Sequence, residues 1–454
     1  MNNPLPATDT SAPLAAAAPA AVPFREALKF WWKLGWISFG GPAGQIAIMH
    51  RELVEERRWI SEKRFLHALN YCMVLPGPEA QQLATYIGWL MHGSRGGIAA
   101  GALFVLPSLF ILIALSWLYL AFGHLPALAA ILWGIKPAVV AIVLAAAWRI
   151  GKRALKNQWL WGLAALSFVS LTFWQLPFPA IVLGAALIGA AGGHFWPQVF
   201  RAGGGHAGKG GAHLPALIDD DTPTPAHARP DRRRLLRLLL AGLALGAAVM
   251  GLLFLFQGGR GLLSDIGLFF TQAALLTFGG AYAVLPYVFH AAVSQFGWLS
   301  AAQMMDGLAL GETTPGPLIM IVAFVGFVAG WSGSPALAVA GATVATFFTF
   351  LPSFLFILLG GPLVEATHDE IRLQAPLTAI TAAVVGVIVN LALFFGWHTV
   401  WPAGVQLAGT DWAALALAAV ALVALVRFEV NVIRLIAACA AAGLAWQLLL
   451  RGLA

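Results

Sequence analysis

The chain has 454 residues, of which 60% are hydrophobic and only 10% are charged. In soluble domains about a quarter of all residues are charged, so this composition excludes a soluble protein. The apolar residues fall in long runs, which predicts a helical protein that crosses the membrane many times. The net charge of +7 comes from short basic clusters between these runs. That is the positive-inside pattern of a membrane protein, and it indicates the lipid bilayer rather than nucleic acid as the partner.

The start of the chain and the two cysteines indicate no further function. Residues 1–23 are rich in Ala and Pro and have no basic segment ahead of a continuous apolar core. We expect a disordered tail there rather than a signal peptide. Cys72 and Cys439 lie far apart in apolar segments, so we expect buried thiols that form no metal pair. The linker histidines also lack metal spacing, and we predict neither a metal nor a cofactor.

The chain contains two copies of one pattern. Three separated positions recur at a constant offset of 239 residues, namely Phe39 and Phe278, Trp59 and Trp298, and Pro76 and Pro315. Beyond them, the Leu-Pro-Ser motif at 106–108 recurs at 351–353, at an offset of 245. Chance rarely preserves such spacing. In a membrane, two copies of a segment broken by Gly and Pro are typical of a transporter whose breaks line the substrate site.

The apolar runs divide the chain into two copies of about six helical segments each. We expect the first copy at 24–196 and the second at 265–450. Between them we predict an exposed, cytoplasmic linker at 197–233, rich in Gly, Pro and Asp, and one extra transmembrane helix at 234–257. This odd extra helix turns the second copy upside down relative to the first. The predicted fold is therefore an all-α polytopic membrane protein of two inverted-topology repeats.

The basic loops predict the orientation of the chain. They place the N-terminus inside the cell and the C-terminus outside. The basic stretch at 51–64 fits only if the broken segments at 24–49 and 65–91 are re-entrant hairpins of two half-helices. If the segments cross the membrane instead, that stretch faces outward. A half-segment of about 12 residues is roughly 18 Å long, which reaches the midplane without spanning. We favour the hairpins.

Four Gly- and Pro-containing breaks are the candidate substrate site. Pro removes a backbone donor and Gly adds conformational freedom, so the helical hydrogen bonds must be interrupted there. The half-helix that follows a break presents free N–H groups and a partial positive charge, which suits an anion. Alternatively, the glycines serve only close helix packing. The candidate residues in the breaks are Gly40, Gly41, Pro42, Pro76, Gly77, Pro78, Gly279, Gly280, Pro315, Gly316 and Pro317.

Ionisable side chains inside apolar runs are costly in a membrane and are therefore further candidates. We predict Lys136 as an anion contact, although it could also be a lysine that snorkels at a helix entrance. Glu79 and Glu312 each lie beside a break and are candidates for proton coupling, but Glu79 also suits the dipole of a helix start. Asn70 could bind substrate or a neighbouring helix. We expect Asp306 to be a solvated segment end.

These motifs resemble the two-domain form of the chromate ion transporter family. The resemblance is carried in the first copy by Phe39-Gly40-Gly41-Pro42, Leu75-Pro76-Gly77-Pro78-Glu79 and Gly96-Gly97-Ile98, and in the second by Thr277-Phe278-Gly279-Gly280 and Thr314-Pro315-Gly316-Pro317. It covers about residues 24–450. It implies a bacterial inner-membrane protein that exports chromate, coupled to the proton motive force, with sulfate as a look-alike anion. The second copy has Ala281 in place of proline and Leu318 in place of glutamate, so the halves are not assumed to be equivalent.

Physical arguments favour export. A dianion that leaves a cell with a negative interior gains about 2.3 kcal/mol per charge per 100 mV, roughly 4–5 kcal/mol in all. That supports about a thousandfold gradient without a co-ion. The alternative is a transporter that takes up sulfate or another oxyanion with protons. A membrane enzyme lacks support, because the chain has no dinucleotide fingerprint and no Cys or His pair at haem or metal spacing, and we predict no catalytic residue. A scaffold would leave the duplicated breaks and Lys136 unexplained. A homo-oligomer remains open.

Overall fold

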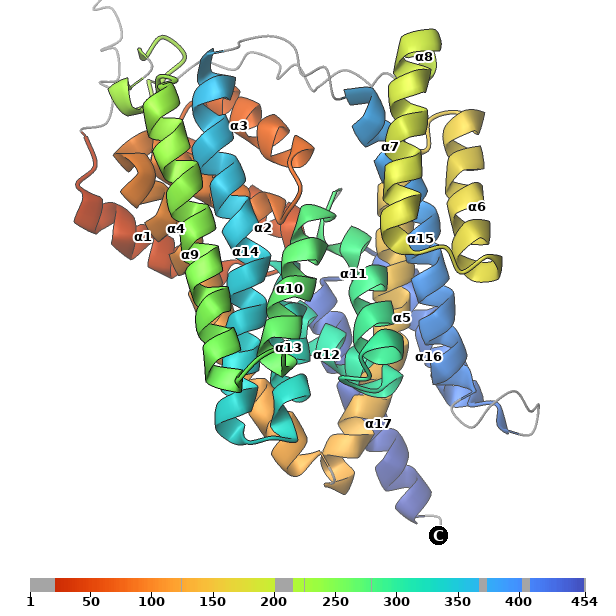
Figure 1. Cartoon of the computed structure of the whole chain (residues 1–454). Coiled ribbons are helices and arrows are strands. Elements are labelled where there is room, and N and C mark those ends of the chain that lie inside the picture. Colours follow the sequence, from red (N-terminus) through yellow and green to blue (C-terminus); the bar gives the residue numbers. More distant parts are fainter. Residues whose placement is uncertain are drawn as a thin grey trace, which may run out of the picture.

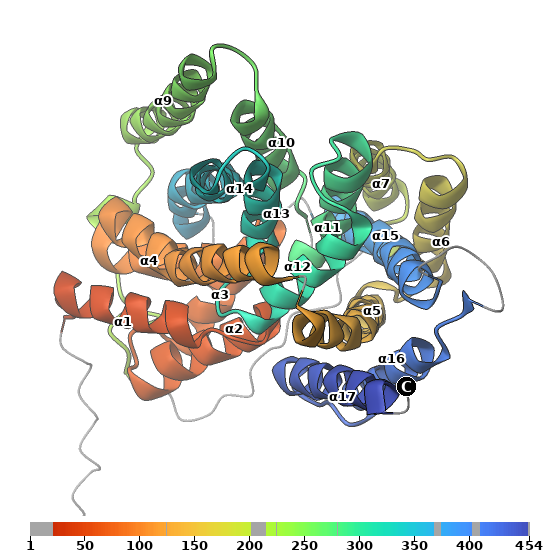
Figure 2. The same cartoon turned by 90° about the horizontal axis from the view of Figure 1, so that it is seen from below.

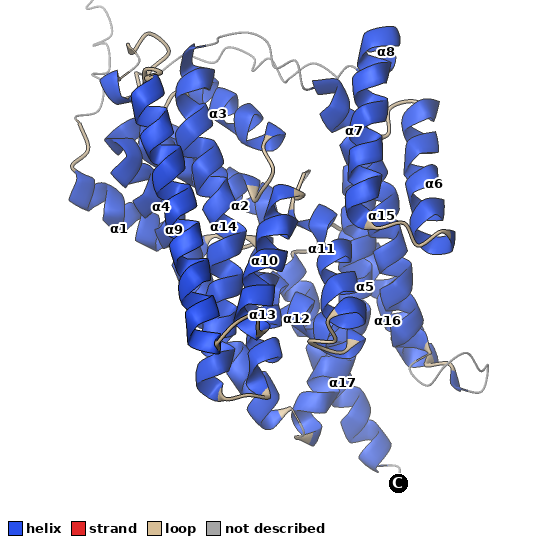
Figure 3. Cartoon of the chain, viewed as in Figure 1, coloured by secondary structure: helices blue, strands red, loops and turns tan. Residues whose placement is uncertain are grey.

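The computed structural model describes residues 21–123, 125–200, 215–223, 225–278, 280–366, 374–401 and 409–452. Within these ranges the chain is helical, apart from an isolated bridge between Ile60 and Ile218 (Figure 3). Seven of the described helices are long and apolar enough to cross a membrane. This confirms the prediction of an all-α polytopic membrane protein. Residues 1–20 of the predicted tail lie outside the described ranges.

The first half of the chain alternates short helices with breaks before its long helices begin. Its longest helix, α4, bends at His92 and Gly93, where the backbone leaves the helical conformation. The elements of this half are α1 (Phe24–Ile37), α2 (Gly41–His50), the π-helical turn η1 (Arg51–Glu56), α3 (Glu62–Val74), α4 (Glu79–Phe122), α5 (Pro126–Ala154), α6 (Gln158–Phe173), α7 (Phe178–Phe195) and α8 (Pro197–Phe200).

The second half has a similar order of elements, except that the turn η4 and the helices α13 and α14 take the place of α4, and its π-helical turn begins 239 residues after η1. Its elements are α10 (Leu262–Leu275), α11 (Ala281–Phe289), the π-helical turn η3 (His290–Gln295), α12 (Ala301–Thr313), the 3-10 turn η4 (Leu318–Met320), α13 (Ile321–Trp331), α14 (Pro335–Ala366), α15 (Gln374–Val400), α16 (Trp412–Arg427) and α17 (Val432–Gly452). The 3-10 turn η2 (Ala226–Ala228) and the helix α9 (Arg232–Gln257) lie between the halves.

The short helices of the two halves approach the middle of the molecule from opposite ends. In Figure 1, α1, α2 and α3 lie in the upper half, and α10 to α13 extend from the centre downward. Figure 2 shows α11 and α12 between the group α1–α4 and the group formed by α5–α7 and α15–α17. The breaks at the ends of the short helices therefore come together at the centre.

Two groups of buried apolar side chains form the core. One surrounds α1–α4 and includes Ile357 and Leu358 of α14. The other extends through the remaining long helices and includes Phe348 of the same helix α14. Cys72 and Cys439 are free and buried, which confirms the expectation for the thiols.

The outer helices carry the apolar surface that a bilayer covers. Trp159, Phe173 and Leu255 are 73%, 72% and 82% exposed. Large exposed apolar areas are rare on soluble monomers and mark a membrane or partner contact. In α9 the most apolar window contains no buried residue, so this helix packs loosely on the rest of the protein.

The stretch at 51–64 forms hydrogen bonds with the linker between the halves. The guanidinium of Arg64 donates to the carbonyl oxygens of Asp219 at 3.3 Å and Thr222 at 2.7 Å. It also forms an ion pair of 2.7 Å with Glu365, which is 4% exposed. The expectation of an exposed linker is therefore wrong for this part, because Ile218 pairs with residue 60 and is 7% exposed.

Candidate functional site

The four breaks are joined crosswise by backbone hydrogen bonds. The Gly77 N–H donates to the Thr277 carbonyl oxygen at 2.7 Å, and the Gly316 N–H donates to the Ser38 carbonyl oxygen at 2.8 Å. Each bond connects the second break of one half to the first break of the other half. Both donors and both acceptors are separated by 239 residues, so the halves make two equivalent bonds. The interrupted helix ends are therefore held at one place.

Glycine is required where these bonds form. The φ angles of Gly77 and Gly316 are +128° and +98°, a region that favours glycine. A Cβ on Gly77 would clash with the Ser353 hydroxyl and lie 2.6 Å from the amide nitrogen of Gln82. A Cβ on Gly316 would lie 2.8 Å from the Ser108 Cβ. The repeated Leu-Pro-Ser motif thus packs against the breaks, again from one half to the other.

Two buried glutamines complete the polar lining. The amide nitrogen of Gln45 donates to the Gly316 carbonyl oxygen, and that of Gln82 donates to the Pro76 carbonyl oxygen at 2.8 Å. The side-chain oxygens of both glutamines are buried and have no hydrogen-bond partner in the protein. The same is true of the Ser108 and Ser353 hydroxyls. Because buried polar atoms are normally paired, these oxygens indicate that water or a ligand enters this region.

Glu79 and Glu312 lie on either side of the start of α11. Glu79 begins α4, and its Oε1 is 3.7 Å from where a Cβ on Gly280 would be. The hydroxyl of Tyr282, two residues further along, donates to Glu312 at 2.5 Å. Glu312 is 6% exposed. The structure therefore brings the two proton-coupling candidates to the same break.

This acidic cluster occurs on one side of the repeat only. At the offset of 239 residues, Glu79 corresponds to Leu318, and Glu312 corresponds to Met73. Tyr282 corresponds to an alanine at position 43. We call each of the two backbone hydrogen bonds, Gly77 to Thr277 and Gly316 to Ser38, a crossing. The two crossings are alike in their backbone, but at these equivalent positions only one of them carries ionisable side chains.

Two arginines near the end of α5 interact with this cluster. Arg149 and Arg153 are exposed and one helical turn apart. Arg153 lies close enough to Glu79 to interact electrostatically, and Arg149 does so with both Glu312 and Tyr282. Two guanidinium groups thus accompany two carboxylates beside the breaks. From the sequence alone, these arginines are interpreted only as positive charges of a cytoplasmic loop.

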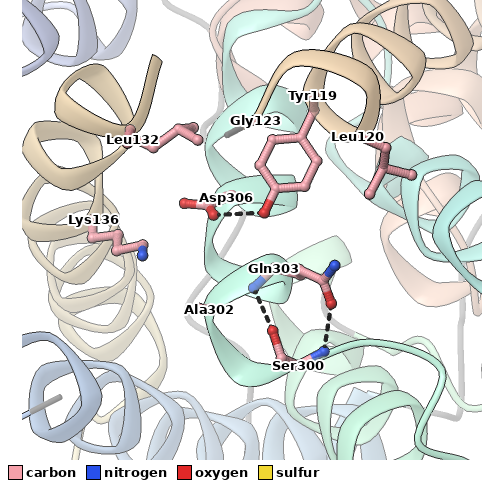
Figure 4. Close-up of a pocket in the computed structure, with 10 residues that line it drawn as sticks. Tyr119, Leu120, Gly123, Leu132, Lys136, Ser300, Ala302, Gln303 and Asp306 are labelled. Atoms are coloured by element: carbon pink, nitrogen blue, oxygen red, sulfur yellow. Dashed lines mark hydrogen bonds between the residues drawn. The ribbon is translucent and has the colours of Figure 1, made fainter. Parts of the chain in front are cut away.

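The structure places Lys136 away from the breaks. Along α5, Lys136 and Arg149 are about 20 Å apart at the rise of an α-helix. Lys136 lines a pocket of about 580 Å³ together with Tyr119 and Asp306 (Figure 4). The expectation that Asp306 is a solvated end is wrong: it is 3% exposed and accepts a hydrogen bond of 2.9 Å from the Tyr119 hydroxyl. It is buried because α4 and α5 cover this part of α12.

Comparison with known proteins identifies the family. The model of the family described as "Chromate transporter" matches residues 25–190 and 264–444, in both halves of the chain. The chain belongs to the chromate transporter family. The motif resemblance is thereby confirmed.

Three chromate transport proteins resemble this family member over most of their length. It is 34% identical over 391 residues to the chromate transport protein of Pseudomonas aeruginosa, covering 82% of this chain and 81% of that protein. It is 29% identical over 399 residues to the chromate transport protein of Cupriavidus metallidurans, with 87% of each covered. It is 29% identical over 377 residues to the probable chromate transport protein of Synechococcus elongatus, covering 83% and 85%. No solved structure matches the chain.

In this chromate transporter family member, the breaks hold most of the predicted site residues. Gly40 precedes α2 with a φ of +92°, and Pro76, Pro78, Pro315 and Pro317 are buried beside their glycines. Gly279 lies outside the described residues. Asn70 is exposed on α3, four residues before that helix ends, and its role stays a prediction.

Sequence reasoning missed several residues that contact the breaks or their acids. They are Gln45, Gln82, Ser108, Arg149, Arg153, Tyr282 and Ser353. The repeat itself signalled the two serines, since the Leu-Pro-Ser motif recurs, but it gave no indication that they touch the breaks.

Proposed function

We propose that this protein exports chromate, a tetrahedral dianion, from the cytoplasm across the bacterial inner membrane. The family and the names of its relatives support chromate as the substrate. The main support for the proposed substrate site is the pair of hydrogen bonds between the breaks of the two halves, because these bonds hold interrupted helix ends together inside an apolar protein. Helix starts present free N–H groups, which suit a dianion. Efflux is driven by the membrane potential and the proton motive force.

The substrate lies between the breaks and the two arginines of α5. Arginine presents a planar set of donors that matches an oxyanion, and Arg153 and Arg149 interact electrostatically with Glu79 and Glu312, respectively. The proposed binding residues at this site are Gly40, Gly41, Pro42, Asn70, Pro76, Gly77, Pro78, Gly279, Gly280, Pro315, Gly316 and Pro317, now joined by the two arginines. Lys136 stays a proposed anion contact, but in its own pocket with Tyr119 and Asp306.

Glu79 and Glu312 are proposed to couple transport to protons. Glu79 lies in electrostatic range of Arg153, and Glu312 lies in electrostatic range of Arg149. A dianion and a carboxylate compete for the same guanidinium group, so a proton on the carboxylate favours the substrate. The coupling therefore acts through two carboxylate–guanidinium pairs.

The broken segments are proposed to be re-entrant hairpins in two inverted repeats. Arg64 contacts Asp219 and Thr222 of the linker, which places the basic stretch and the linker at the same end of the molecule. Segments that cross the membrane would separate them. This basic end is the cytoplasmic one, with the N-terminus inside and the C-terminus outside. The proposed repeats are 24–196 and 265–450, joined through 197–233 and the connecting helix 234–257.

The hairpins predict that two equivalent positions are accessible from opposite sides. Glu55 and Ser294 are both exposed and are 239 residues apart. In a background without Cys72 and Cys439, a membrane-impermeant thiol reagent is expected to label Glu55→Cys in inside-out vesicles and Ser294→Cys in intact spheroplasts. Labelling of Glu55→Cys from the outside would contradict the hairpins and favour crossing segments.

Flux measurements in inside-out vesicles test the function. With the vesicle interior made positive, we expect labelled chromate to accumulate in vesicles that contain this protein and not in vesicles without it. Because efflux moves two negative charges, accumulation should collapse when the potential is dissipated. Faster movement of sulfate than of chromate would instead support a transporter for another oxyanion. Absence of both fluxes would refute the proposal.

A further inference from the structure

The pocket around Lys136 lies at the end of the molecule away from the arginines. It is formed by the end of α4, the beginning of α5 and the beginning of α12 (Figure 4). Its described lining residues are Tyr119, Leu120, Gly123, Ala129, Leu132, Lys136, Ser300, Ala302, Gln303 and Asp306. A volume of about 580 Å³ has room for a hydrated small anion. In the proposed orientation this is the outer mouth.

The two charged groups among the described lining residues do not neutralise each other by direct contact. Figure 4 shows the Lys136 ammonium reaching into the pocket without a hydrogen bond to Asp306. Asp306 Oδ2 accepts from the Tyr119 hydroxyl, whereas Oδ1 is buried and has no hydrogen-bond partner. Lys136 acts on Asp306 electrostatically across the pocket. The ammonium is therefore available to a ligand, and one oxygen of the carboxylate, Oδ1, lacks a donor.

The start of α12 adds a second attraction for an anion. Ser300 and Gln303 form a capping box, and both line the pocket together with Ala302. The helix has 13 residues, and its first turn carries the positive end of the helix dipole. Lys136 and this helix start thus favour an anion in the same space, while the charge of Asp306 opposes it.

We propose that this pocket is a second oxyanion site, where Lys136 holds the departing dianion and Asp306 drives its release. The inference rests on the proposed function, since it concerns the exit of the same substrate. With Asp306 charged, the dianion is repelled and leaves. With Asp306 protonated, the carboxyl group donates a hydrogen bond and the dianion stays. The site is thus weak when the outside is neutral.

The other elements around α12 contribute few charges to this balance. In the described residues, α13 and η4 carry no titratable side chain, α4 presents Tyr119 and α5 presents Lys136. α15 carries His398 and α17 carries Arg434, but neither lines the pocket. His124 follows Gly123 in the sequence and lies outside the described residues, so His124→Gln serves as a control for its titration.

Binding of labelled chromate and sulfate to the purified full-length protein, measured by equilibrium dialysis, tests the inference. We expect two anions per wild-type chain, one per chain after Lys136→Met, and one per chain after joint replacement of Arg149 and Arg153 by alanine. Asp306→Asn should tighten the outer site about tenfold and make its affinity for sulfate, which stays a dianion, independent of pH. Lys63→Met, at an exposed lysine of α3, is the matched control and should bind two.

The variants separate the two proposals. Loss of all binding on Arg149 and Arg153 replacement would show that the outer pocket holds nothing and would overturn this inference while leaving the central site intact. Two anions per chain in Lys136→Met, or an unchanged affinity in Asp306→Asn, would also overturn it. Gel filtration of each variant checks that it is folded. If the wild-type protein transports chromate normally but binds only one anion per chain, the outer site is contradicted and the proposed function is not. If it transports no chromate, the proposed function itself is contradicted.

Discussion

Gly77→Ala is expected to lower chromate flux about a hundredfold, because a small displacement at a positioning site can have that effect. Its Cβ would meet the Ser353 hydroxyl and lie 2.6 Å from the Gln82 amide nitrogen, at a φ of +128°. Relief of these contacts requires the break to move, which weakens the hydrogen bond from its N–H to Thr277. Initial rates in inside-out vesicles, normalised to the amount of inserted protein, measure the effect.

Two further variants show whether the contact causes the loss. Gly162→Ala lies in α6, where an added Cβ meets nothing within 4 Å, and it should transport at the wild-type rate. Ser353→Gly in the Gly77→Ala background removes one of the clashing groups and should restore part of the flux. Wild-type flux in Gly77→Ala would show that the crossing of the breaks has no role in transport.

The sequence predicts the architecture well because composition and spacing are local properties. Long apolar runs predict the membrane helices, and the offset of 239 residues locates the breaks. The partners of the breaks are a different matter. Nothing in the sequence indicates that Gly77 bonds to Thr277 rather than to its own half, because that choice depends on how the two copies pack.

The same reason explains the individual errors. Asp306 was expected in solvent from its place near a segment end, yet α4 and α5 cover it. The Gly and Pro content of the linker predicts an exposed segment, yet Ile218 pairs with Ile60. Arg149 reads as a loop charge in the sequence, although it lies within α5 and acts on Glu312. Each error concerns a tertiary neighbour.

The two halves have the same backbone hydrogen bonds at the breaks, and they differ in the side chains beside them. Both crossings have a backbone bond and a serine against a glycine. Glu79 and Glu312 lie beside the crossing of Gly77 with Thr277, and Arg153 and Arg149 interact with them electrostatically. We infer that each chain has one central substrate position, and that proton coupling takes place at the crossing of Gly77 with Thr277.

Arg149→Ala is expected to lower chromate flux at least about tenfold, because hydrogen bonds to a charged group are the strong ones that a dianion site depends on. It also leaves Glu312, which is 6% exposed, without its nearby cation. Arg153→Ala should have a similar effect through Glu79. Initial rates over a range of chromate concentrations should show a raised half-saturation concentration as well as a lower maximum.

Two substitutions on the same helix distinguish a binding role from a general effect of charge. Arg149→Lys keeps the charge and loses the planar donor set, so partial flux is expected. Lys152 lies at the same end of α5, but its ammonium is 4.8 Å from the centre of the Trp148 ring. Lys152→Ala therefore removes an equal charge from a different face and should leave flux unchanged. If Lys152→Ala and Arg149→Ala reduce flux equally, the arginines act only through the positive potential of the inner end, and the substrate binds elsewhere.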